Sequence, residues 1–367
     1  MYEKEVQKAQ ERLNAALSLA NQQPDEAVNM IEDMLKWVKE TLPNDCPEFY
    51  GIVITYNEVM GDLRLKARKF VEAEGYYKQM VNYSRELYEL DKEKYDLRLA
   101  NAYAKLANNC RSCINCNIFS TKPMTLTEMT QRPFDAGVNF YKAAITVIND
   151  NAKKGSGKHL EFRAQCIAAL AVMNAAVGNY KDSINMFKDS ISIYKAIYQA
   201  LDNLAAGITL GNTMSSLATV YSLYKDAEKA AEALEDSIYV LLEHEKEDPV
   251  RSGVLIARNY MNLAGCYVLL KRDQEEIDGA YEKATQKISM ANAIGKNAAV
   301  GDEITCYMLS GQYYANTGKK DKGTKLLEHA YDLAKDASEK NPSNKQFSLM
   351  RDRIGGLLGI KKEEADK

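Results

Sequence analysis

The stretch that decides the fold is GQYYANTGKKDKGTKLLEHAYDLA, residues 311–334. It places small residues at Gly311, Gly323 and Ala330 and a large apolar residue at Leu327. Apolar residues recur at helical intervals on both sides of TGKKD, which has the composition of a short turn. A small residue on one helix lets a bulky side chain of its partner pack closely. The spacing therefore predicts two antiparallel helices.

The same spacing repeats along the chain and predicts seven helix pairs of one kind. The small residues aligned with Gly311 are Ala15, Gly61, Ala107, Ala171, Ala218 and Gly265. Those aligned with Gly323 are Ala27, Ala73, Gly137, Ser183, Ala230 and Ile277, at separations of 46 or 47 residues except for one of 64. The large residues aligned with Leu327 are Ile31, Tyr77, Tyr141, Phe187, Leu234 and Tyr281. The long interval indicates an 18-residue insertion in the third pair, and the bulky Ile277 indicates a locally shifted register.

The composition agrees with long helices and excludes several classes of protein. Glycine (20) and proline (7) are scarce in 367 residues, and we expect the prolines to mark the joints between helices. The net charge of −3 leaves no basic surplus for a nucleic-acid partner. No apolar run approaches the roughly 18 residues of a membrane span, so we expect no membrane partner. Seven cysteines, an odd number, mostly within apolar helical patterns, predict a reduced, cytoplasmic chain.

The repeat resembles the tetratricopeptide repeat (TPR), whose signature has small residues at positions 8, 20 and 27 and a large apolar one at 24. Residues 311–334 match it best, and AVMNAAVGNYKDSINMFKDSISIY (171–194) is next. The usual TPR period is ~34 residues, so the chain is similar to long-period relatives such as kinesin light chains and bacterial peptide-sensing regulators. HEAT and armadillo repeats have suitable periods but lack this spacing. The resemblance implies an all-α, right-handed α-solenoid (a TPR-like superhelix) over residues 1–342, and 343–367 are expected to form a capping helix and a frayed tail.

The 110–130 insertion is expected to be an irregular or short helical excursion between the helices of pair three. Phe119, Met124 and Leu126 need cover, so we expect it to fold back over the groove or an edge, where it could act as a gate. It opens with Cys110, Cys113 and Cys116, a CxxCxxC spacing that can bind zinc or an iron–sulfur cluster. On a straight helix the three sulfurs do not converge, and free cysteine is a common buried residue. The structural interpretation is therefore preferred, with a metal site as the minority hypothesis.

The concave groove holds the candidate binding residues. The resemblance implies that positions 2, 5, 9, 12 and 13 of each first helix face a ligand. Position 2 corresponds to Ala9, Thr55, Asn101, Gln165, Asn212, Asn259 and Thr305. An amide offers donors and an acceptor, so a ladder of amides can pair with the backbone of an extended peptide. The predicted peptide-binding residues are Asn101, Asn108, Gln165, Asn212, Ser215, Asn259, Asn262, Gln312 and Asn316. The alternative is that such residues only tie helices together, because Asn and Thr favour caps.

The predicted function is a non-catalytic protein- or peptide-binding scaffold. The three histidines lie far apart, and KKGSGK (153–158) lacks the spacing of a phosphate loop, so we expect neither an enzyme nor a cofactor. The lysine-and-asparagine clamp of chaperone-binding TPRs is not reproduced. The alternative function is a peptide-responsive sensor or regulator whose superhelix changes shape. Related regulators carry an N-terminal module for which this sequence leaves no room, so a simple scaffold or a fragment of a larger chain is favoured. The oligomeric state is not predicted.

Overall fold

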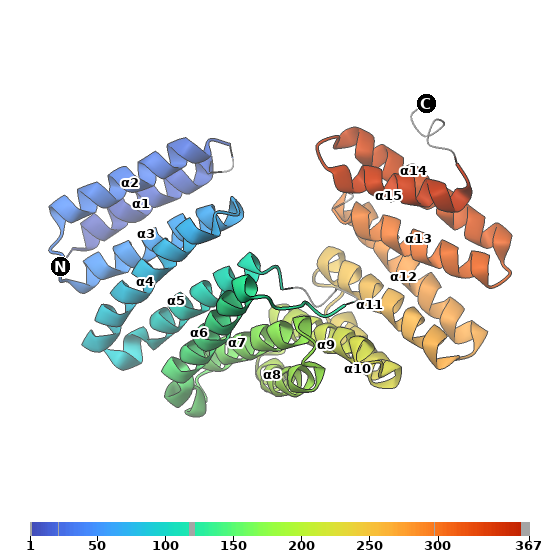
Figure 1. Cartoon of the computed structure of the whole chain (residues 1–367), viewed down its shortest axis with the longest axis horizontal. Helices are drawn as coiled ribbons and strands as arrows, with labels where there is room; N and C mark the ends of the chain where they lie inside the picture. The colour runs from blue at the N-terminus through green and yellow to red at the C-terminus, as the bar shows by residue number, and fades with distance from the viewer. Residues whose placement is uncertain (1, 21, 117–121, 297, 361–367) are drawn as a thin grey trace. The chain divides into compact units, whose positions relative to one another are not determined.

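We describe a computed structural model of the chain over residues 2–20, 22–116, 122–296 and 298–360 (Figure 1). These residues contain fifteen helices and no strand. The chain divides into two compact units, Met1–Ile193 and Tyr194–Lys367, and each is described by itself. The helices form seven consecutive pairs followed by a single last helix, so the predicted all-α solenoid is confirmed.

The first unit holds the first three helix pairs, the first helix of the fourth, and the start of the eighth helix. Its helices are α1 (Glu3–Leu19), α2 (Pro24–Thr41), α3 (Pro47–Lys66), α4 (Phe70–Leu90), α5 (Lys92–Cys113), α6 (Glu128–Lys153) and α7 (Gly157–Ala176). Consecutive helices of the unit contact one another, and the first helix of each pair also contacts the first helix of the next pair. The buried apolar residues therefore lie in a continuous row of cores between successive pairs.

The second unit repeats this arrangement over the rest of the chain. The unit boundary lies within α8 (Tyr180–Leu201). The helices that follow are α9 (Leu204–Leu223), α10 (Ala227–Glu243), α11 (Pro249–Leu270), α12 (Gln274–Gly295), α13 (Val300–Asn316), α14 (Lys320–Lys340) and α15 (Lys345–Leu358). Among the residues that the structure describes, no helix is both long enough and apolar enough to cross a membrane.

The predicted contact between small and large residues is present in the second and seventh pairs. A methyl group added at Gly61 would lie 2.5 Å from the ring of Tyr77, so only glycine fits at this position. At Gly311 it would lie 2.8 Å from Leu327 and 3.0 Å from a backbone oxygen of the facing helix. Ser183 replaces the small apolar residue and donates its hydroxyl to the Ala171 carbonyl at 2.8 Å. The small–large spacing thus marks true points of closest approach between helices.

Two positions depart from this rule. A methyl group added at Gly265 would meet nothing within 4 Å, although Gly265 aligns with Gly311. On the second helix of the same pair, the bulky Ile277 is buried and Ala280, three residues on, is buried as well. The helices α11 and α12 still pack closely against each other. Their close contacts therefore lie at other positions, and Gly265 is not a contact point in this pair.

Prolines stand at the starts of three helices, and one proline lies inside a helix. Pro24, Pro47 and Pro249 each stand at the start of a helix, where the missing N–H costs nothing. The prediction that prolines mark the joints is wrong for Pro133, which lies inside α6. The helix begins before it because Thr127 and Thr130 form a capping box at its start.

The described part of the insertion lies against the end of α7. The Met124 N–H donates to the Ala176 carbonyl at 2.6 Å. Pro123 lies beside Gly178, in the turn after α7. Met124 also packs on the apolar core of the third and fourth pairs. The insertion therefore covers an edge of this unit, as one of the two predicted alternatives stated, while Phe119 lies outside the described residues and the gate stays a prediction.

The last helix covers the seventh pair. Ile354 of α15 is fully buried, and Phe347 and Met350 pack against the same core of α13 and α14. The helix ends at Gly359, whose φ of +77° is the left-handed conformation common after helices. Its bounds lie within the predicted capping segment; the predicted frayed tail lies largely outside the described residues, and the division at residue 342 stays a prediction.

We predict that Gly311→Ala lowers the stability of the chain, whereas the aligned Gly265→Ala does not. The first change overpacks a closed contact and should cost about 1–3 kcal/mol. The second removes backbone freedom in an open helix position and should be neutral or stabilise by about 0.5–1 kcal/mol. Urea unfolding followed by circular dichroism measures both. Equal effects would show that the tight contact at Gly311 does not determine the stability of the pair.

Candidate functional site

The first helices of successive pairs form a shared wall in each unit. In the first unit α1, α3, α5 and α7 contact one another in sequence. In the second, α9 contacts α11, α11 contacts α13, and α13 contacts α15. Side chains at equivalent positions of these helices therefore recur at regular intervals along one wall. The predicted binding residues all lie on these first helices.

The structure divides the nine predicted residues into three groups. Gln165, Asn212, Asn262 and Asn316 are exposed. Asn101 and Gln312 are half-buried, and the Asn101 amide reaches Glu58 on the neighbouring first helix at 3.4 Å. The other three, Asn108, Ser215 and Asn259, are engaged in contacts between helices. The surface available to a ligand is therefore smaller than the predicted set.

Asn259 is the clearest case of a structural role. Its side chain is 3% exposed. Its oxygen accepts a hydrogen bond from Ser215 on α9 at 2.7 Å, and its NH₂ donates to Ser237 on α10 at 2.8 Å. Ser237 in turn donates to the Gly211 carbonyl at 2.7 Å. Asn259 thus ties three helices together, and both of its polar side-chain atoms have partners inside the protein.

Asn108 has a similar role in the first unit. Its side-chain oxygen accepts from the Tyr141 hydroxyl of α6 at 2.7 Å and from Arg111 at 3.3 Å. Tyr141 is 1% exposed, so its hydroxyl needs such a partner. These contacts match the alternative in which polar residues hold helices together, although through side chains of neighbouring helices and not through caps.

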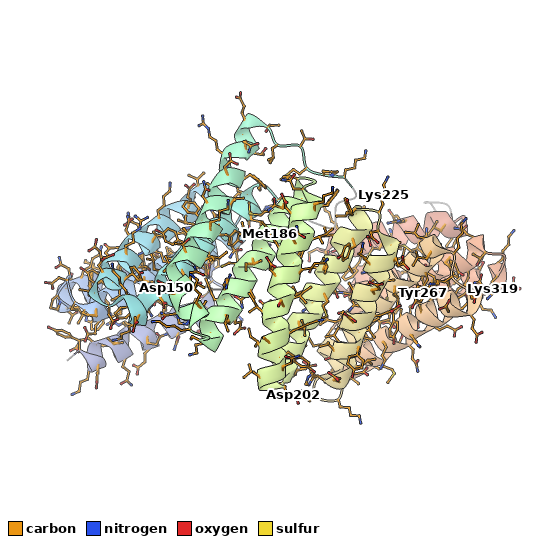
Figure 2. All side chains as sticks on the ribbon, turned by 90° about the horizontal axis from the view of Figure 1, so that it is seen from below. Asp150, Met186, Asp202, Lys225, Tyr267 and Lys319 are labelled. Atoms are coloured by element: carbon orange, nitrogen blue, oxygen red, sulfur yellow. The ribbon has the colours of Figure 1, made fainter. Side chains whose placement is uncertain are left out.

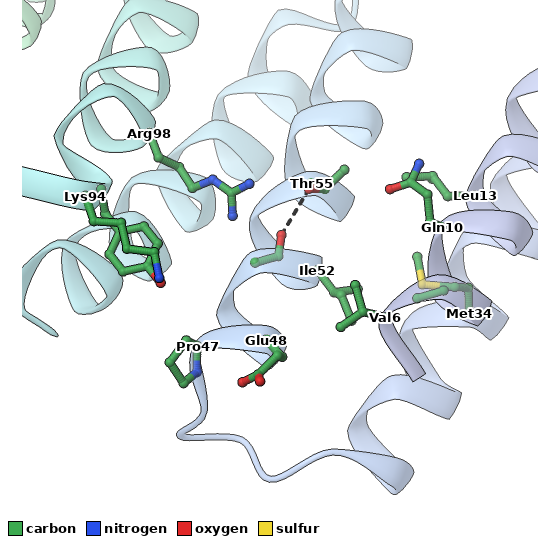
Figure 3. Close-up of a pocket in the computed structure, with 13 residues that line it drawn as sticks. Val6, Gln10, Leu13, Met34, Pro47, Glu48, Ile52, Thr55, Lys94 and Arg98 are labelled. Atoms are coloured by element: carbon green, nitrogen blue, oxygen red, sulfur yellow. Dashed lines mark hydrogen bonds between the residues drawn. The ribbon is translucent and has the colours of Figure 1, made fainter. Parts of the chain in front are cut away.

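Two pockets open between the first helices of the first unit. One has a volume of about 480 Å³ and lies between α1, α3 and α5 (Figure 3). The other has a volume of about 520 Å³ and lies between α3, α4 and α5. Position-2 residues line both: Ala9 and Thr55 the first, and Thr55 and Asn101 the second. Position-2 residues thus line both pockets in pairs one to three. Of these residues only Asn101 belongs to the predicted peptide-binding set.

The residues that dominate these pockets were missed by the sequence reasoning. Lys94, Tyr95 and Arg98 line both pockets. They precede position 2 of α5, Asn101, by one to two turns. A repeat of ordinary length does not have these turns, so the TPR positions could not point to them. The long period was the signal that the wall extends further.

Charges alternate between α3 and α5 along this wall. The Lys105 ammonium lies 2.7 Å from Asp62 and 3.1 Å from Glu58. Burial by itself would lower the pKa of Lys105, but its hydrogen bond to Asp62 and the charge of Glu58 raise it above the ordinary value. In this part of the wall Lys105 is therefore paired within the chain, and the three groups together carry one negative charge.

The three cysteines of the CxxCxxC segment have different surroundings. Cys110 is buried, Cys113 is exposed and Cys116 is half-buried. Burial raises the pKa of Cys110 and that of Cys116 to about 11. Within the described ranges, which include these three residues, no group of three or more His, Cys, Asp and Glu side chains is placed to hold a metal ion. The structural interpretation of this segment and the minority hypothesis of a metal site therefore both stay predictions.

Asp96 and His159 form a buried polar contact between α5 and α7. The His159 Nε2 lies 2.9 Å from Asp96, and its Nδ1 lies 2.7 Å from the Ser156 hydroxyl. Asn151 donates to the same carboxylate at 2.6 Å. Asp96 is 3% exposed, so its charge requires these partners. The cluster lies outside both first-helix pockets and fastens pair three to pair four.

Comparison with known proteins identifies the fold. No family model and no curated protein sequence matches the chain. The crystal structure of BtubC (BKLC) from P. vanneervenii is similar, with a TM-score of 0.50 and 16% identity over 80% of this chain and 92% of that one. The apo form of RapI is similar, with a TM-score of 0.51 and 8% identity over 90% of this chain and 99% of that one. The chain has the fold of a TPR-like helical repeat.

We predict that Asn259→Ala destabilises the chain while Asn212→Ala does not. The first change leaves Ser215 and Ser237 without their partner, which should cost about 1–3 kcal/mol. Asn212 is exposed on the preceding first helix, so its truncation should change the free energy of unfolding by less than about 0.5 kcal/mol. Urea unfolding compares the two variants. Equal stability would mean that the Asn259 contacts contribute nothing.

We also predict that iodoacetamide at pH 8 modifies Cys113 first in the native chain. Burial raises the pKa of Cys110 to about 11 and that of Cys166 and Cys306 to about 12, so these thiols hold little of the reactive thiolate at this pH. Mass spectrometry of the digested protein measures the order of labelling. Labelling of Cys110 as fast as Cys113 would contradict the placement of α5.

Proposed function

We propose that the chain is a non-catalytic scaffold that binds a protein segment in an extended conformation along its first helices. The observation that carries this proposal is that two pockets of the first unit open between consecutive first helices and are lined by position-2 residues. Pockets of about 480 and 520 Å³ are in the range that ligands fill. The wall has a repeating spacing, which suits a repeating ligand such as a peptide backbone.

The exposed amides support the same proposal in the second unit. Within the described chain, the side chains of Asn212, Asn262 and Asn316 have no hydrogen-bond partner, and all three are exposed. Each offers donors and an acceptor without a charge, so each can pair with a peptide N–H or C=O group. Such groups match a polypeptide better than a phosphate or a metal ion.

Affinity would come from many weak contacts. A hydrogen bond to a peptide backbone contributes only about 0.5–1.5 kcal/mol net. Several amides, together with apolar pockets that take side chains, are therefore needed for useful binding. All seven cysteines are free thiols, which supports a reducing compartment such as the cytoplasm for this activity.

A peptide-library screen with the full chain tests the proposal. We expect hits whose affinity falls at least about fivefold in the double variant Asn212→Ala, Asn262→Ala, because two backbone contacts are lost. The matched control is Gln286→Ala, which removes an exposed amide from α12, a second helix. Hits that bind the double variant as tightly as the parent would remove these residues from the site, and a screen without hits would contradict the function. A change of the scattering profile on binding would favour the alternative of a shape-changing regulator.

A further inference from the structure

Arg98 is a cation without a carboxylate at the junction of the two pockets. Its neighbours further along α5 each reach an acid on α3 that lies 43 residues earlier in the chain: Asn101 reaches Glu58 and Lys105 reaches Asp62. The residue 43 positions before Arg98 is Thr55. At this step of the wall the acid is therefore replaced by a hydroxyl, and within the described residues Arg98 has no ion pair.

The backbone of α3 leaves space for the guanidinium. Thr55 donates its hydroxyl proton to the Gly51 carbonyl at 3.0 Å, and a hydroxyl carries no charge to pair with the guanidinium. Gly51 has no side chain, and a methyl group there would lie 3.2 Å from Nη1 of Arg98. Figure 3 shows Arg98 reaching from α5 towards this part of α3. The guanidinium thus lies across the groove, and its N–H groups are available to donate to an acceptor on a ligand.

An apolar surface lies opposite the arginine. Val6 and Leu13 of α1, Met34 of α2 and Ile52 of α3 line the same pocket, and Figure 3 shows Val6 beside Ile52. Glu48 also lines this pocket; its charge contributes to the raised pKa of Lys94, after the larger effect of that lysine's contact with Tyr95. One side of the pocket is therefore apolar, and the other carries two cations, Lys94 and Arg98, and one acid, Glu48.

We propose that this junction binds an acidic side chain, Asp or Glu, within an extended peptide segment that carries an apolar side chain beside it. The inference rests on the proposed function and specifies its ligand. A guanidinium and a carboxylate pair through two parallel hydrogen bonds, which is the contact that Arg98 lacks. The neighbouring apolar side chain would lie on Val6, Leu13 and Ile52.

The shape of the groove favours an internal acid over a chain terminus. Thr55, Lys94, Tyr95 and Arg98 line both pockets, so open space continues on both sides of the arginine. A peptide can therefore pass Arg98 and continue towards Asn101, which lines the far pocket. A C-terminal carboxylate would leave one of the two pockets empty.

The test uses pairs of nine-residue peptides, acetylated and amidated at their ends, with Glu or Gln at the centre and Leu or Ser beside it. Fluorescence anisotropy with the full chain measures the affinity of each peptide. We expect the parent to prefer Glu over Gln at least about tenfold, because the hydrogen bond is charge-assisted. The preference should fall with added salt. In Arg98→Gln the ratio of the affinities for the Glu and Gln peptides should approach one.

Three further variants sharpen the test. Arg132→Gln removes an exposed arginine from α6, a second helix, and should leave the preference unchanged. Gly51→Ala keeps the charge but displaces Nη1, and should lower the preference. Val6→Ser should reduce the advantage of Leu over Ser beside the acid without removing the preference for Glu. Circular dichroism melting checks that each variant is folded.

The outcomes separate this inference from the proposed function. A preference for Glu that survives in Arg98→Gln, or an unchanged preference in Gly51→Ala, would overturn the inference. So would a preference that appears only when the peptides carry a free C-terminus. Peptides that bind without any preference for Glu, and lose affinity in the double variant Asn212→Ala, Asn262→Ala, would leave the proposed function in place and overturn this inference. A chain that binds no peptide at all would overturn both.

Discussion

The close contact between a small residue on the first helix and a large one on the second is the constraint on which the structure depends. Tyr77 fits against Gly61 and Leu327 against Gly311 because neither glycine carries a side chain. The contact fixes how near the two helices of a pair lie, and this distance sets which faces remain to pack on the next pair. In the sixth pair Ile277 takes the position of the small residue, and Gly265 makes no close contact there.

Polar residues serve two different purposes in this architecture. Buried ones, such as Asn259 and Asp96, have nearly all of their hydrogen-bonding groups satisfied by neighbouring helices, because an unpaired polar group in the core is costly. Exposed ones on the first helices, such as Asn212 and Asn262, keep their groups available. Both kinds occupy similar positions of the repeat. Burial therefore decides whether such a residue ties helices together or keeps its polar groups exposed.

The turns of α5 that precede position 2 extend the wall between the first helices. A TPR of ordinary length would begin near Asn101 on α5, whereas this chain continues through Arg98 and Lys94 before the helix starts at Lys92. The added turns widen the wall between the first helices, and both pockets of the first unit reach into them. The unpaired Arg98 thus lies in a region that the short repeat does not have.

The sequence by itself determined the helix pairs, their order and the points of closest contact, because these depend on local periodicity and on residue size at fixed spacing. Pro133 shows its limit for boundaries, since a capping box a few residues earlier decided where α6 begins. The tertiary structure decided which polar residues are free. Asn212 and Asn259 occupy the same repeat position, yet one is exposed and the other is buried against Ser215 and Ser237. Only the packing of neighbouring helices distinguishes them, because partners 22 and 44 residues away are brought together by the fold and not by the local pattern.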